Sequence, residues 1–124
     1  MPVHVDPSHG PAPVCVAFSG DVSVDEIEAQ FADLARLTRE VPSLLVDFRK
    51  ARLDITHSGF MQLADRWFSA IGADVRTAVV FDEAETDRAM LLSTKAFLAG
   101  AIVKSFFDTE TARAWLSAGS GPQD

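Results

Sequence analysis

The sequence predicts a single α/β domain: a mostly parallel sheet of four to five strands, built from sequential strand–helix units with about four helices. Three observations indicate this class. Apolar runs of strand type alternate four times with stretches of helical spacing, the connections are short, and capping residues, Gly or Pro stand at most boundaries. Strands joined through a helix this closely form right-handed crossovers, which makes neighbouring strands parallel.

The strands are expected where apolar runs are bounded by turn residues. The first thirteen residues hold four prolines and are expected to form an extended segment with one short edge strand. The turn residues Ser19-Gly20-Asp21 are expected to close the second strand, and a basic loop is expected after the third. In chain order, the expected strands are Val3 to Asp6, Val14 to Phe18, Ser43 to Phe48, Thr77 to Phe81 and Ile102 to Phe107.

Each expected helix begins at a residue that accepts hydrogen bonds from the first turn and ends at Pro or Gly. Two pairs have the spacing of a capping box: Ser23 with Glu26, and Asp82 with Glu85. Ser58 is expected to cap the second helix, and Gly100 to adopt the left-handed conformation after the third. The helices are expected at residues 23–42, 58–72, 82–100 and 108–119. Residues 14–116 are therefore expected to form one domain, with residues 1–13 as an N-terminal extended segment and 117–124 as a flexible tail.

Charge and cysteine content narrow the class of protein. The formal net charge is -7, which argues against nucleic-acid binding because phosphate contacts require clustered Lys and Arg. Cys15 is the single cysteine, so an internal disulfide is impossible and a reducing compartment is favoured. The most apolar stretch, residues 89–103, is too short and too often interrupted to span a bilayer, and no secretory signal pattern is visible. We expect a cytoplasmic protein.

Two segments resemble a known family. Leu44-Leu45-Val46-Asp47-Phe48-Arg49 is followed by a loop and the helix start Ser58-Gly59, and the run Phe106 to Leu116 joins a strand that ends in Phe to a helix that reads Ala-x-x-Trp-Leu. Together they resemble the STAS domain (sulfate transporter and anti-sigma-factor antagonist), in its SpoIIAA-like branch. The resemblance covers about residues 14–116. It implies a SpoIIAA-like (STAS) fold with an antiparallel first strand, no chemistry of its own, and a protein partner or, in some branches, a nucleotide or apolar ligand.

The resemblance also singles out the turn Thr56 to Phe60 as a regulatory or partner-binding element. In anti-sigma-factor antagonists this loop typically reads Asp-Ser-Ser-Gly, and a partner kinase phosphorylates the first Ser. Aligned on Gly59, this chain has His57 at the acceptor position, so we do not expect that phosphoswitch. Thr56 and Ser58 still offer hydroxyl groups for modification. The simpler interpretation of Ser58 is a helix N-cap worth about 1 kcal/mol.

Two further groups of residues have a functional and a structural interpretation. Arg49, Lys50 and Arg52 are candidate anion contacts beside a helix N-terminus, or a solvated basic loop. Three carboxylates at strand ends are candidate magnesium ligands, or helix caps and surface charges: Asp47, Asp82 and Asp108. Capping is favoured, and no catalytic residue, metal ligand or cofactor is expected.

The helix expected at residues 83–99 carries apolar residues on more than one face, whereas a helix on a sheet needs one apolar stripe. The surplus indicates a partner surface, a self-association surface or the wall of an apolar groove; the alternative is deep burial between helices. The candidate apolar ligand or interface surface is Phe60, Trp67, Phe68, Met90, Leu91 and Phe97.

The sequence therefore favours a non-enzymatic, STAS-type binding or regulatory module that acts by protein–protein contact, without the usual phosphoacceptor serine. The expected partner is another protein or a second copy of the chain. The alternative is a carrier or sensor of a small apolar or lipid-like ligand, held on the apolar surface just named. A nucleic-acid partner and a membrane span are not expected.

Overall fold

The computed structural model describes residues 3–6, 13–72 and 74–118. Within these residues, five strands form one sheet whose spatial order equals their order in the chain. The first pair is antiparallel and the other three pairs are parallel. The strands are β1 (Val3–Asp6), β2 (Val14–Val22), β3 (Ser43–Leu53), β4 (Arg76–Val80) and β5 (Val103–Phe106). The predicted mostly parallel sheet and the antiparallel first strand implied by the resemblance are confirmed.

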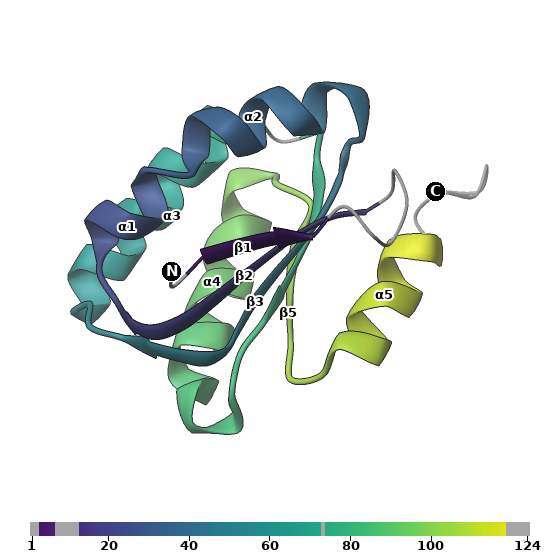
Figure 1. The fold of residues 1–124 in the computed structure, drawn as a ribbon. Coiled ribbons are helices and arrows are strands. Elements are labelled where there is room, and N and C mark those ends of the chain that lie inside the picture. The colour runs from purple at the N-terminus through teal and green to yellow at the C-terminus, as the bar shows by residue number, and fades with distance from the viewer. Residues whose placement is uncertain (1–2, 7–12, 73, 119–124) are drawn as a thin grey trace.

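Helices cover both faces of this sheet, four on one face and one on the other, in the part of the chain that the structure describes (Figure 1). They are α1 (Val24–Glu28), α2 (Phe31–Glu40), α3 (His57–Ile71), α4 (Thr86–Ala99) and α5 (Thr109–Ala118), with a short 3-10 helix η2 (Glu83–Glu85) before α4. No helix among these residues is long and apolar enough to cross a membrane.

The two faces follow from the alternation of side chains along the strands. In β3, Leu44, Val46 and Phe48 belong to the larger core, which α1 to α4 cover. Leu45 lies on the opposite face, in a smaller core that contains Leu116 of α5. Because both faces are covered, β3 is apolar at the consecutive positions Leu44, Leu45 and Val46, as expected for parallel strands.

The expected helices, about four in number, are present, and the first of them is broken into two parts. The N–H of Gln30 bonds to the carbonyl of Ile27, three residues back, at 3.0 Å. Such a bond tightens and ends the helical turn, so α1 stops at Glu28 and α2 begins at Phe31. The capping box at the start of α1 is confirmed, with Ser23 and Glu26 each bonded to the other's backbone N–H.

Strands β2 and β3 continue beyond their predicted ends. Ser19, Gly20 and Asp21 were expected to form a turn, but they pair in parallel with Lys50, Ala51 and Arg52. An extra residue in β3 shifts the register between Ala17 and Ser19, which keeps the two strands paired. The expected basic loop is therefore an extension of β3, because backbone hydrogen bonds from a neighbouring strand outweigh local turn preference.

Two predicted helix starts and the start of the predicted tail also differ. Asp82 accepts a hydrogen bond from the N–H of Ala84, but the carboxylate of Glu85 pairs with Arg88, so the second capping box does not form. The N-cap of α3 is Thr56 rather than Ser58. Helix α5 continues to Ala118, so residues 117 and 118 of the predicted tail are helical, while residues 119–124 lie outside the described residues.

Candidate functional site

The turn at the start of α3 is organised by the hydroxyl of Thr56. Its backbone is extended, as an N-cap requires, and its side chain accepts a hydrogen bond from the N–H of Gly59 at 3.0 Å. A Cβ at Gly59 would lie 3.1 Å from that hydroxyl oxygen, so glycine lets the cap form without displacement. Ser58 is the second residue of the helix, which leaves its hydroxyl free of the capping role that the sequence predicted.

The five residues of the predicted turn divide into an accessible part and an anchor. Thr56, His57 and Ser58 are exposed, whereas Phe60 is buried. The ring of Phe60 lies edge-on to that of Phe81 in the larger core, with 6.3 Å between centroids. His57 and Ser58 are therefore exposed on a turn that the buried ring of Phe60 anchors in the core.

A hollow of about 390 Å³ lies beside this turn and joins α3 to α4. Its lining residues are His57, Asp87, Met90, Leu91 and Thr94. The structure thus brings the predicted turn together with two of the predicted apolar surface residues. Sequence reasoning missed Asp87 and Thr94, although their spacing of seven residues places them on one face of a helix.

The apolar residues of α4 outside its buried stripe are exposed to solvent. Its buried stripe consists of the small or slender residues Ala89, Leu92 and Ala96, which let the helix lie close to the sheet. In contrast, Met90 is 65% exposed and Phe97 is 83% exposed. Deep burial, the structural alternative for these residues, is therefore wrong, and an apolar surface is present.

The three basic candidates line a second hollow, of about 590 Å³, beside the extended ends of β2 and β3. Carboxylates of Asp21, Asp82 and Glu85 line it as well. Two of the cations are paired there or beside it, Arg49 with Asp47 at 2.9 Å and Arg52 with Asp21 at 3.6 Å. The hydrogen bond from Arg49 to Asp47 raises the pKa of the guanidinium. Since carboxylates offset these positive charges, the geometry gives the anion contact little support.

The carboxylates at strand ends have structural partners. Asp108 caps α5, where its oxygens accept from the N–H and the hydroxyl of Thr111 at 2.7 and 2.9 Å. These hydrogen bonds, led by the one from the backbone, lower the pKa of Asp108. Asp82 caps η2, and Asp47 pairs with Arg49. Among residues 3–6, 13–72 and 74–118, no group of three or more His, Cys, Asp or Glu side chains could hold a metal ion.

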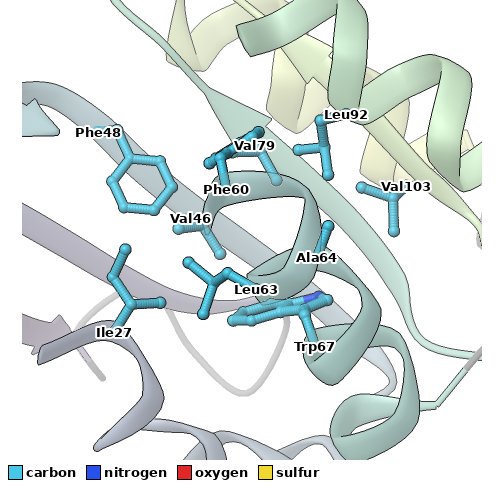
Figure 2. Close-up of a pocket in the computed structure, with 10 residues that line it drawn as sticks. All are labelled: Ile27, Val46, Phe48, Phe60, Leu63, Ala64, Trp67, Val79, Leu92 and Val103. Atoms are coloured by element: carbon cyan, nitrogen blue, oxygen red, sulfur yellow. The ribbon is translucent and has the colours of Figure 1, made fainter. Parts of the chain in front are cut away.

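A small apolar cavity of about 40 Å³ lies in the larger core, between α3 and the sheet (Figure 2). Its lining residues are Ile27, Val46, Phe48, Phe60, Leu63, Ala64, Trp67, Val79, Leu92 and Val103. The predicted apolar surface is therefore divided in two. Phe60 and Trp67 line this internal cavity, Phe68 packs half-buried against the core, and the three residues of α4 do not line it.

Comparison with known proteins identifies the fold. No family model matches the sequence, and no curated protein matches it. Among solved structures, the chain is similar to an uncharacterised DUF3478-family protein with a SpoIIAA-like fold from Shewanella loihica PV-4, with a TM-score of 0.58 and 11% identity over 92% of this chain and 93% of that chain. It is also similar to an anti-sigma factor antagonist from Mycobacterium paratuberculosis, with a TM-score of 0.58 and 15% identity over 84% of this chain and 85% of that chain. The chain therefore has the SpoIIAA-like fold.

Proposed function

We propose that this protein is a non-enzymatic regulatory module that binds a protein partner through the turn Thr56 to Phe60. The observation that carries the proposal is the hollow that His57 of this turn lines together with Met90 and Leu91 of α4. It offers an exposed polar group beside accessible apolar side chains, on a backbone fixed by the Thr56 cap and the Phe60 anchor. This combination is typical of protein interfaces, where polar groups surround an apolar centre.

The fold supports this proposal through one of its neighbours, which is an anti-sigma factor antagonist. The turn of this chain has His57 where the resemblance expects a phosphorylated serine. We therefore propose that binding depends on the shape and polarity of the turn, and that no phosphate is needed. His57 offers ring nitrogens for hydrogen bonds, and Ser58 offers a hydroxyl that the cap does not use.

The test is affinity capture from the native host with the intact chain as bait. The double variant His57→Ala, Ser58→Ala should lose a stoichiometric partner that the unchanged chain retains. The variant Gln62→Ala, Ser69→Ala is the matched control, because it alters two exposed residues of the same helix away from the turn. Retention of the partner by the His57 and Ser58 variant would refute the role of the turn.

The second candidate function is the binding of a small apolar ligand. The apolar cavity between α3 and the sheet favours it, because it is lined by Phe60 and Trp67. Its volume of about 40 Å³ is far below the roughly 300 Å³ at which pockets for drug-sized ligands begin, so it suits only a molecule of a few heavy atoms. Native mass spectrometry of the freshly purified protein tests this candidate, and a consistently ligand-free mass would contradict it.

A further inference from the structure

The C-terminal end of α4, beyond the residues that line the hollow, carries further exposed apolar side chains. Phe97 and Leu98 are 83% and 77% exposed, and Ile102, just after the left-handed Gly100, is 40% exposed. We call these three residues the apolar corner. The eight residues 96–103 contain no charged side chain. Met90 stands two helical turns before Phe97, which extends the apolar surface along α4.

The outer edge of β5 is occupied by α4 at one residue, Ser105. β5 is the last strand of the described sheet, so one of its edges faces away from β4. The N–H of Ser105 in β5 donates to the hydroxyl oxygen of Ser93 in α4 at 3.3 Å, and the Ser105 hydroxyl donates to the carbonyl of Ala89 at 2.8 Å. A backbone N–H satisfied in this way is not available to an added strand. The exposed apolar side chains of α4 favour an occupant that packs against the helix.

The exposed apolar area of this corner can be compared with the apolar area that a dimer interface buries. With about 150–250 Å² for a full large apolar side chain, the apolar corner exposes roughly 350–400 Å² per copy. A stable interface buries about 800 Å² per partner, and homodimer interfaces are about 65% apolar, which corresponds to roughly 500 Å². The apolar corner therefore supplies most of the apolar share of one such interface.

The charge of the chain limits where two copies can make contact. Each copy carries a formal charge of -7, so two copies repel wherever charged surfaces meet. Contact through an uncharged surface keeps the carboxylates at the rim. A two-fold axis needs a surface complementary to itself, and exposed Phe, Leu and Ile side chains meet that requirement. We propose that the protein forms a homodimer through the apolar corner, with α4 of one copy packed against α4 of the other.

Sedimentation equilibrium of the full chain, from low micromolar to several hundred micromolar, tests this proposal. We expect a reversible dimer. Phe97→Glu and Leu98→Glu should each weaken dimerisation by about tenfold or more, because two-fold symmetry places both new carboxylates in the same interface. At concentrations where the unchanged chain is monomeric, the denaturation midpoint should be the same for the variants, since both side chains are exposed in the monomer. Ser69→Glu, an equally charged change at an exposed site of α3, is the control and should leave the dimer intact.

A monomer at all concentrations would overturn the proposal, as would a dimer that both corner variants leave unchanged. If the corner variants instead lost a captured partner while the chain stayed monomeric, the corner would be a surface for a different protein and the dimer would be refuted. The capture experiment with His57 and Ser58 does not depend on either result, so the proposed function and the dimer can fail separately.

Discussion

Replacement of Val79 by Ile adds one methylene group to the wall of the core cavity. Val79 lies in the central strand β4, is 4% exposed, and faces the cavity of about 40 Å³ (Figure 2). Because the replacement is also β-branched, strand preference is unchanged. Burial of one methylene contributes about 0.8 kcal/mol. Cavities in protein cores generally lower stability by about 24 cal/mol per Å³, so complete filling of this cavity would raise the unfolding free energy by at most about 1 kcal/mol.

The assay is urea unfolding followed by circular dichroism, with the slope against denaturant checked for constancy. We expect an increase of about 0.5–1 kcal/mol in unfolding free energy, or about 2–4 °C in Tm. Val80→Ile is the matched control, since Val80 is fully buried on the opposite face and does not line the cavity. Because no cavity accepts the added methylene at Val80, this control should lower the unfolding free energy by about 1–3 kcal/mol. Equal effects at the two positions, or a loss of stability at Val79, would refute the assignment of the cavity.

Three further changes test local features of the fold. Thr56→Ala should lower the unfolding free energy by about 1 kcal/mol while Ser58→Ala leaves it unchanged, and the reverse order would contradict the observed cap. Gly100→Ala should lower the unfolding free energy by about 1–2 kcal/mol, because the backbone at this residue has φ of 73°. An added Cβ would have no atom within 4 Å, so the effect would come from the backbone conformation alone. An unchanged unfolding free energy would show that this conformation is not required. Thr111 lowers the pKa of Asp108, so this carboxylate stabilises the fold above its unfolded pKa and the effect is lost as pH falls through the folded pKa. Thermal unfolding curves of Asp108→Ala and the unchanged chain should therefore converge in acid, and a constant gap at every pH would contradict this reasoning.

The sheet was predictable because its signals are local. Apolar runs, short connections and caps such as Ser23 with Glu26 determine the order of elements, and the handedness of crossovers makes their strands parallel. The extension of β2 and β3 could not be predicted in this way. Ser19-Gly20-Asp21 has the composition of a turn, and only the distant residues Lys50 to Arg52 make it a strand. Non-local pairing decided between two locally acceptable conformations.

The site shows the same division between local and non-local information. The position of the turn between strand and helix was predicted correctly, but Thr56 and Ser58 are both good N-caps and only the backbone geometry distinguishes them. The apolar residues of α4 were recognised from their spacing. Whether Phe97 would be buried or exposed depends on what lies over the helix, which the sequence of one element does not contain. His57 and Met90 line the same hollow because α3 packs beside α4, and this packing is not contained in the sequence of either helix.

Hydrogen–deuterium exchange of the captured complex tests the central claim most directly, because it reports where the partner sits. Binding through the turn predicts slower exchange at the start of α3, from His57 onward, and in the first half of α4 around Met90 and Leu91. Helix α5, on the opposite face of the sheet, should exchange at the same rate with and without the partner. Protection confined to α5, with the start of α3 unchanged, would contradict the account.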